Sequence, residues 1–264
     1  MTKSSHRCIE QCMDCDGSAA HADVMWQTLP VPWFGDLRSG RVEVATVGLN
    51  PSWTEFETKE RNLRNTKERL PAIADFGAKC RRELNSAQSK QAAAARTRYF
   101  VPGEEREPHP YLKKLQGVMA AAVRATGRDW AYASGTALHL DIVACSTWPE
   151  WGKLSTEAQE ALVSRCFPKF AATLSQIPSA AWLLLDGRTV FDTVRRRCDA
   201  VVSLETAVGE NPRLDVWRGR LSSAFGNREF LGWSNPVGRQ KNQQPLVAWL
   251  RSQVPTEEGR RRFT

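Results

Sequence analysis

Three short polar segments that could bind a ligand each follow an apolar, strand-like stretch of the sequence. They are Asn50-Pro51-Ser52, Asp141 with Ser146-Thr147-Trp148, and Ser234-Asn235-Pro236. An ionised Asp141 only accepts hydrogen bonds, whereas an Asn side chain both donates and accepts them. Backbone N–H groups at residues 50–52 could bind a phosphate or a carbonyl oxygen, because successive N–H groups in a turn form an anion-binding concavity. The three segments therefore offer donors and acceptors for a polar or phosphorylated ligand.

Apolar strands alternate with amphipathic helices between these segments. The predicted strands are Arg41–Val47, Ala137–Ala144, Ala181–Leu185 and Glu229–Trp233, and the main predicted helices are Pro110–Thr126, Ser155–Gln176, Thr189–Cys198 and Pro245–Gln253. This alternation predicts an α/β fold of three layers, α/β/α, with a central, mostly parallel sheet of four strands. Because ligands bind such sheets beyond the carboxyl ends of the strands, we expect the polar segments to converge on one edge.

The remaining segments divide the chain into three parts. Residues 1–35 are expected to form an N-terminal extension that contains a cysteine cluster, and residues 255–264 a frayed tail. Residues 36–254 are expected to form one α/β domain with a helical insertion at about 55–130. The stretch 199–227 is weakly patterned, which is typical of a hairpin or a long loop.

The chain is basic, with a formal net charge of +8 and a pI near 9.3. Such a balance suits a polyanionic partner, because Lys and Arg displace condensed counterions from phosphates. The sequence has no apolar run of about 18 residues, so no membrane partner is expected. The N-terminus lacks the apolar stretch of a signal peptide, which predicts a cytoplasmic protein.

Seven cysteines in a chain without an export signal argue against a disulfide framework. Cys8, Cys12 and Cys15 are spaced as ligands of zinc or of an iron–sulfur cluster, with His6, His21 or Cys80 as the fourth ligand. The alternative is a tail that contains three thiols and no metal. The other cysteines, Cys80, Cys145, Cys166 and Cys198, are expected to be small buried apolar residues.

Two motifs resemble those of the uracil-DNA glycosylase superfamily. Val44–Ser52, VATVGLNPS, is similar to its first active-site motif, in which a strand ends in a Gly-x-Asn-Pro turn. Leu231–Gln240, LGWSNPVGRQ, is similar to its second motif, a late loop that enters the DNA minor groove. The match is closest to the mismatch-specific thymine/uracil and single-strand-selective branches and extends over about residues 40–250. It implies a monofunctional DNA glycosylase that needs no cofactor for catalysis and has DNA as its partner.

Such an enzyme flips a nucleotide out of DNA and hydrolyses the bond between base and sugar, leaving an abasic site. The resemblance implies that Asn50 holds the attacking water and that Asp141 either reads the base or orients the water with Asn50. The implied substrate-binding residues are Gly48, Leu49, Pro51, Ser52, Trp53, Phe56, Phe100, Trp148, Ser234 and Asn235. The implied DNA-binding residues are Pro236, Val237, Gly238, Arg239, Gln240 and Lys241, with Val237, Arg239 or Gln240 as the wedge that fills the gap in the duplex.

Two departures from the family pattern bear on the substrate. Many members have a His at the start of the second motif, where this chain has Trp233-Ser234, and uracil-specific members read the base with an Asn where this chain has Asp141. An ionised Asp would repel O4 of uracil but accept a hydrogen bond from the amino group of cytosine. The hypothesis is therefore a glycosylase for a modified cytosine, as in defence against phage.

Three alternatives remain open at the level of sequence. One is a repair glycosylase for uracil or mismatches. Another is a catalytically weak module that binds modified DNA, and it follows from the missing motif-two His. The third is an unrelated α/β hydrolase that uses Cys145 or Asp141 as its nucleophile.

Overall fold

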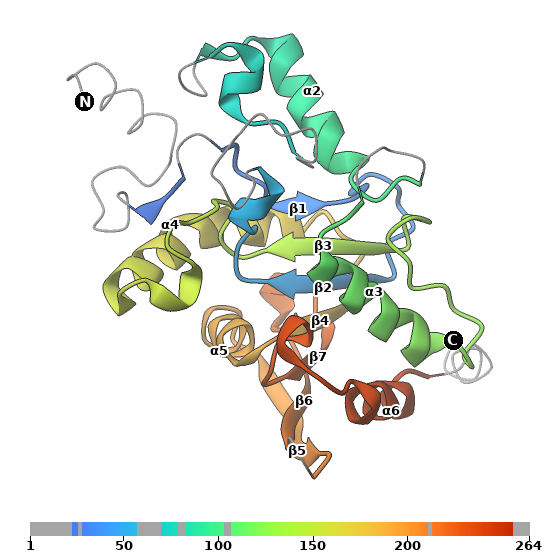
Figure 1. Ribbon diagram of the computed structural model, residues 1–264. Helices are drawn as coiled ribbons and strands as arrows, with labels where there is room; N and C mark the ends of the chain where they lie inside the picture. The colour runs from blue at the N-terminus through green and yellow to red at the C-terminus, as the bar shows by residue number, and fades with distance from the viewer. Residues whose placement is uncertain are drawn as a thin grey trace. The chain divides into compact units, whose positions relative to one another are not determined.

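The computed structural model describes residues 23–25, 28–56, 70–78, 83–102, 107–210 and 213–255 (Figure 1). The predicted metal ligands Cys8, Cys12 and Cys15 lie outside these residues, as do His6, His21 and Cys80. Within the described ranges, no group of three or more His, Cys, Asp or Glu side chains could hold a metal ion. Cys145, Cys166 and Cys198 are buried free thiols, as predicted, and burial raises the pKa of Cys198 to about 12.

The predicted α/β class is confirmed, but the predicted four-stranded, mostly parallel sheet is wrong. One mixed sheet contains seven strands in the order β1-β3-β2-β4-β7-β6-β5. The strands are β1 (Trp33–Phe34), β2 (Val44–Gly48), β3 (Ala137–Asp141), β4 (Trp182–Asp186), β5 (Val201–Val208), β6 (Leu214–Arg220) and β7 (Glu229–Trp233). The four predicted strands correspond to β2, β3, β4 and β7.

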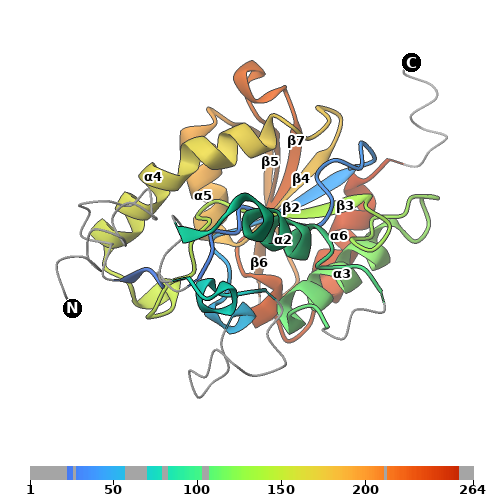
Figure 2. The same ribbon diagram turned by 90° about the horizontal axis from the view of Figure 1, so that it is seen from above.

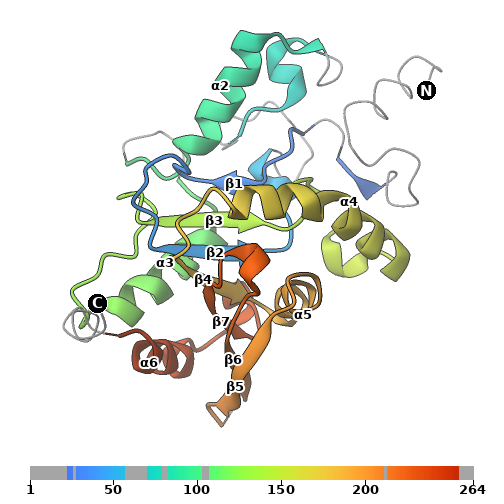
Figure 3. The same cartoon turned by 180° about the vertical axis from the view of Figure 1, so that it is seen from behind.

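The sequence pattern did not predict β1, β5 and β6 as separate strands, for physical reasons. β1 has only two residues, too few to show a period of two. β5 pairs antiparallel with β6, and β6 pairs antiparallel with β7. Because β5 pairs on one side only, its side chains are mostly exposed and it lacks a clear apolar alternation. The weakly patterned stretch 199–227 therefore contains a hairpin, seen beyond β7 in Figure 3.

Five α-helices occur in the described part of the chain. They are α2 (Ser86–Thr97), α3 (Pro110–Val123), α4 (Thr156–Leu174), α5 (Arg188–Arg197) and α6 (Gln244–Gln253). Pro110 opens α3, where its missing N–H has no helical partner to lose, and the side chain of His109 accepts a hydrogen bond from the N–H of Tyr111. α2 buries no residue and begins with a capping box formed by Asn85 and Gln88.

The described residues belong to two compact units. The first unit contains those of Met1–Phe34, Leu49–Glu107 and Leu140–Thr173. The second contains those of Gly35–Gly48, Pro108–His139 and Leu174–Thr264.

The second unit has a core of parallel strands. β2 and β7 both pair parallel with β4, in a register that places Val47 opposite Leu185 and Asp186 opposite Trp233. All five residues of β2 and of β4 are buried, as expected for strands covered on both faces. α5 lies on one side of β4 and β7, and α3 and α6 lie together on the other (Figure 2). These packed layers hold the carboxyl ends of β4 and β7 in a fixed register.

Candidate functional site

The first candidate site is the turn that follows β2, in the first unit. The side chain of Asn50 is half-buried, and its Nδ2 donates to Thr147 Oγ1 at 3.3 Å and to the carbonyl oxygen of Cys145 at 3.5 Å. The backbone carbonyl of the next residue lies 3.4 Å from the same nitrogen. Three surrounding oxygens identify this end of the amide as the donor. Within the described residues no hydrogen bond reaches Oδ1 of Asn50, so this oxygen can accept one from a water or a ligand.

Two tryptophans lie beside this turn. The rings of Trp53 and Trp148 meet edge to face, with centroids 5.2 Å apart. Trp148 directly follows Thr147 and keeps 42% of its surface exposed, which is unusual for so large an apolar side chain. Ser52 caps the short 3-10 helix Trp53–Glu55 by accepting a hydrogen bond from the N–H of Thr54. The turn therefore presents an open amide oxygen next to an exposed aromatic surface.

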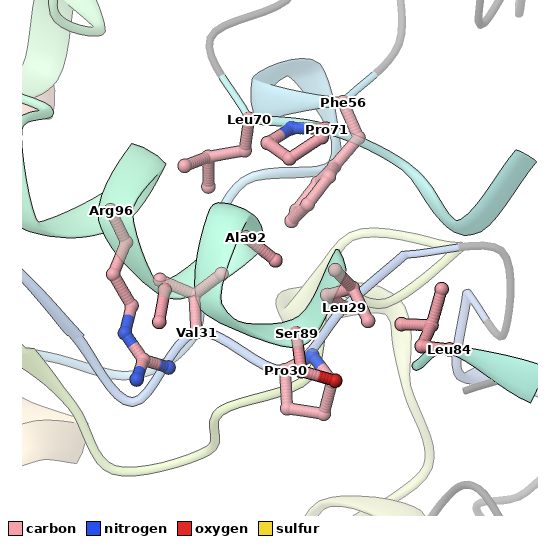
Figure 4. A pocket seen from close by; sticks show the side chains of 11 residues that line it. Leu29, Pro30, Val31, Phe56, Leu70, Pro71, Leu84, Ser89, Ala92 and Arg96 are labelled. Atoms are coloured by element: carbon pink, nitrogen blue, oxygen red, sulfur yellow. The ribbon is translucent and has the colours of Figure 1, made fainter. Parts of the chain in front are cut away.

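Other residues predicted from the sequence to contact substrate lie in the interior of the first unit. Phe56 is fully buried and lines a cavity of about 120 Å³, which also has Leu29, Leu70 and Arg96 in its wall (Figure 4). Phe100 is buried edge to face against Tyr99.

Asp141 ends β3 and is also buried. Only 2% of its surface is exposed, and its backbone N–H donates to the carbonyl oxygen of Pro32. Ser146, in the loop that follows, is fully buried, and its hydroxyl has no hydrogen-bond partner among the described residues. A buried carboxylate and a buried hydroxyl both cost free energy unless they are hydrogen-bonded. The hydroxyl of Ser146 is therefore a polar group of this loop that a bound polar ligand would stabilise.

The second candidate site, in the second unit, is organised by Asp186 at the end of β4. Its Oδ1 accepts hydrogen bonds from the backbone N–H of Val237 at 2.9 Å and from the indole N–H of Trp233. Its Oδ2 accepts one from the hydroxyl of Tyr111 at 2.6 Å. Burial raises the pKa of Asp186, while these three hydrogen bonds and the electrostatic effect of His139 oppose the rise. The carboxyl group thus joins β4, β7, α3 and the loop after β7.

A chain of contacting polar side chains extends from this group, with Tyr111 half-buried and the others buried. The rings of Tyr111 and His139 lie edge to face, with centroids 6.0 Å apart. Nδ1 of His139 is 2.8 Å from Oγ1 of Thr46, which is 2.7 Å from the hydroxyl of Tyr132. Such networks fix the side chains that take part in them, because each unpaired member would be costly in the interior.

The loop 234–241 follows β7 and has a mixed surface. Ser234, Asn235 and Pro236 are half-buried, and Gly238, Arg239 and Lys241 are exposed. Val237 is fully buried and Gln240 is 5% exposed, with its side-chain amide donating to the carbonyl oxygen of Asn235. Of the three residues predicted to act as a wedge, only Arg239 therefore lies at the surface in this conformation.

Cationic side chains surround this loop. Nζ of Lys114 donates to the carbonyl oxygen of Gly238 at 3.4 Å. The guanidinium of Arg188 pairs with Asp215 at 2.7 Å and lies over the ring of Trp217. Lys114, Arg239 and Lys241 are exposed and make this loop basic, whereas the charge of Arg188 is paired with Asp215.

Sequence reasoning assigned no function to Asp186, Tyr111 or His139. A carboxylate at the end of a fully apolar strand was the signal that could have revealed Asp186, because ionisable side chains are rarely buried without partners. Tyr111 and His139 are distant in sequence and are recognisable as partners only from the fold.

The two groups of predicted residues are thus each assembled within one unit. Asn50, Ser52, Trp53 and Trp148 come together in the first, and residues 234–241 form one loop in the second. No protein-family model matches this sequence, and no curated protein sequence is similar enough to count as a relative. No helix in the described ranges is both long enough and apolar enough to cross a membrane.

Proposed function

We propose that this chain is a DNA glycosylase that flips a base out of DNA and hydrolyses its N-glycosidic bond, with a modified cytosine as the favoured base. The proposal extends the resemblance of Val44–Ser52 and Leu231–Gln240 to the uracil-DNA glycosylase superfamily. The observation that carries it is the orientation of Asn50, whose amide nitrogen is engaged by Thr147 while its amide oxygen is open. A basic loop and a net charge of +8 support a polyanionic partner.

The open oxygen of Asn50 suits the chemical step. As the bond to the base breaks, positive charge develops on the sugar and negative charge on the departing base. Oδ1 of Asn50 would accept a hydrogen bond from a water and so direct the oxygen of that water toward the sugar carbon. An amide performs this task without the desolvation cost of a buried carboxylate. Asn50 positions the water, and the proton that the water loses passes to solvent after the bond forms.

The exposed ring of Trp148 would hold the extrahelical nucleotide. Aromatic side chains stack on any base, because every base presents a π-face. Asp141 would accept a hydrogen bond from the exocyclic amino group of the base, a donor that cytosine has and uracil lacks. Because Asp141 is only 2% exposed, the base has to enter the loop between β3 and Trp148 to reach it.

Excision assays test this function directly. Duplex and single-stranded DNAs carrying uracil, a thymine mismatch, cytosine or a modified cytosine are incubated with the protein, and abasic sites are revealed by alkaline cleavage. We expect cleavage at the modified cytosine above that at uracil. Asn50→Ala should lower kcat by at least about 100-fold, the effect usual for loss of one preorganised polar group. Equal or greater cleavage at uracil would refute the base preference, and full activity of Asn50→Ala would refute the assigned role.

A modified-DNA-binding protein without excision activity is the second candidate. Trp233 stands where many family members carry a His, and its indole N–H is bound to Asp186 inside the protein. Trp233 is fully buried and cannot donate to a departing base. Tight binding to modified DNA by the wild-type protein without any cleavage would favour this function.

A further inference from the structure

The loop 234–241 packs on a buried carboxyl group that the proposed reaction does not use. Asp186 is 4% exposed and receives three hydrogen bonds, from Tyr111, Trp233 and Val237. Two of the donors belong to the strand β7 and to the loop itself. The third, Tyr111, is on α3, so the group also connects the loop to a helix.

Backbone hydrogen bonds also join the residues after Asp186 to the end of β7 and the start of the loop. The N–H of Gly187 donates to the carbonyl oxygen of Trp233, and the N–H of Arg188 donates to that of Ser234, both at 3.0 Å. A Cβ atom at Gly187 would lie 2.9 Å from Cγ of Pro236, so the loop approaches the end of β4 too closely for any side chain there.

Gly238 makes a similar approach on the other side of the loop. A Cβ atom at this position would lie 3.2 Å from the ring of Tyr111. The loop is thus held at the end of β4 by Asp186 and lies against α3 at Tyr111, whose hydroxyl donates to the same carboxyl group.

We infer that Asp186 is a positioning residue that holds the loop 234–241 in the conformation that presents Arg239 and Lys241 to DNA. This inference rests on the proposed function for the identity of the ligand. The anchoring of the loop stands on the contacts of Asp186 alone. Removing the carboxyl group would leave the N–H groups of Trp233 and Val237 buried without an acceptor, and the loop would relax to let solvent reach them.

The test compares Asp186→Ala and Asp186→Asn with the wild-type protein. An Asn side chain can still accept from Val237 and Trp233 through its oxygen, and its NH₂ can donate to the hydroxyl of Tyr111, so it retains the anchor. Asp192→Asn is the matched control, because Asp192 is a half-buried acidic residue on α5. Each variant is first checked for folding by circular dichroism and thermal unfolding.

The first readout does not depend on DNA. Hydrogen–deuterium exchange of the peptide that covers residues 233–241 should be at least about tenfold faster in Asp186→Ala, with exchange of β2 unchanged. Asp186→Asn should stay within about threefold of the wild type, since only the contact with Tyr111 changes its donor. Unchanged exchange of this peptide in folded Asp186→Ala would overturn the inference. If Asp186→Ala does not fold, exchange in Tyr111→Phe decides, and no increase in that variant would overturn the inference.

The second readout is binding of the free protein to a fluorescent DNA that carries a modified cytosine, together with KM and kcat for excision. We expect Asp186→Ala to raise Kd and KM at least about fivefold and to change kcat less than about twofold. A fall in kcat of about fivefold with no change in KM would mean that Asp186 does not act through the DNA-contacting loop. If the wild-type protein neither binds nor cuts any DNA, the proposed function fails, while the exchange experiment still reports on the anchor.

Discussion

The side-chain amide of Asn50 donates to the hydroxyl of Thr147 over 3.3 Å, and this contact joins the turn after β2 to the loop after β3. The bond leaves Oδ1 of Asn50 without a partner among the described residues and so determines which end of the amide is available. An Asn that could rotate freely would present its NH₂ group as often as its oxygen. Thr147 therefore helps to orient the amide of Asn50 so that its oxygen stays available as an acceptor.

Replacing Thr147 with Val removes the hydroxyl but preserves the shape of the side chain. We expect kcat for excision to fall about five- to tenfold, because one net hydrogen bond of about 1 kcal/mol no longer orients the amide. Thr147→Ser retains the hydroxyl and should keep kcat within about twofold of the wild type. Single-turnover excision by the three proteins measures the effect, and equal rates for Val and Ser would contradict it.

The exposed ring of Trp148 should dominate binding of an extrahelical or unpaired base. We expect Trp148→Ala to weaken binding to a short single-stranded DNA about tenfold, since base–aromatic stacking contributes about 1–3 kcal/mol. Trp148→Phe should recover most of the affinity, because a smaller ring can still stack. The control is Val101→Ala, which removes another exposed apolar side chain, 46% accessible. Fluorescence anisotropy measures the affinities, and equal losses for Trp148→Ala and Val101→Ala would contradict a specific stacking role.

Arg239 and Lys241 are exposed on the loop after β7 and should bind phosphates. The double variant Arg239→Ala with Lys241→Ala should weaken DNA binding regardless of sequence. It should also reduce the slope of log K against log salt by about 1.4–1.8, because each of the two phosphate contacts contributes about 0.7–0.9 to that slope. Arg124→Ala, which removes an exposed cation at the end of α3, is the control and should change the slope little. Identical slopes for the wild type and the double variant would exclude phosphate contacts by this loop.

The buried parallel part of the sheet could be predicted from the sequence, because continuous apolar runs such as Ala181–Leu185 leave few alternatives. Most helices were predicted to within a few residues for the same reason, since their apolar faces have a clear period. For residues 199–227 the sequence pattern could not decide between a hairpin and a long loop, because β5 lies at the edge of the sheet, where its side chains mostly face solvent. Its bulge between Val202 and Leu204 further disturbs the alternation on which strand prediction depends.

The residues of the candidate sites also differ in how far they could be predicted from the sequence. Turn residues such as Asn50 and Trp148 were predicted because polar or exposed groups after an apolar strand are conspicuous. Asp186 was not predicted, because its hydrogen bond to Tyr111 joins residues that are 75 positions apart in the sequence. Burial in the structure also separates candidates for the wedge that the sequence could not separate. Val237 and Arg239 are equally plausible wedges in the sequence, but only Arg239 is exposed.

The pKa of Asp186 should make stability depend on pH. Burial raises this pKa above its ordinary value of 3.8, although Tyr111, Val237 and Trp233 donate to the carboxyl group and His139 also favours its charged form. The folded state therefore holds the proton more tightly than the unfolded state does. The stabilisation is complete below the unfolded-state pKa and is lost as pH rises through the raised folded-state pKa.

Asp186→Asn is neutral at every pH and should lack this dependence. We expect the difference in unfolding free energy, variant minus wild type, to increase as pH rises from below 3.8 through the folded-state pKa and then to level off. Urea titrations at several pH values measure this difference. Asp192→Asn, at a half-buried position on α5 of the same unit, is the control. A difference that decreases with pH would mean that the three donors outweigh burial and lower the pKa.

Gly187 connects β4 to α5 in a conformation that only glycine adopts readily. Its φ is 111°, and a Cβ atom there would lie 2.9 Å from Cγ of Pro236. Gly187→Ala should therefore lower the unfolding free energy by about 2 kcal/mol or more, through backbone strain and displacement of the loop. Thermal and urea unfolding of the variant measure this loss.

Gly117→Ala provides the matched opposite to Gly187→Ala. Gly117 lies inside α3, and a Cβ atom there would meet open space, with no neighbouring side chain within 4 Å. Ala should therefore stabilise the helix by about 1 kcal/mol. Because both changes add one methyl group, opposite signs isolate the backbone conformation and the contact with Pro236 as the cause. Equal effects of the two substitutions would instead show that the loop tolerates displacement from the end of β4.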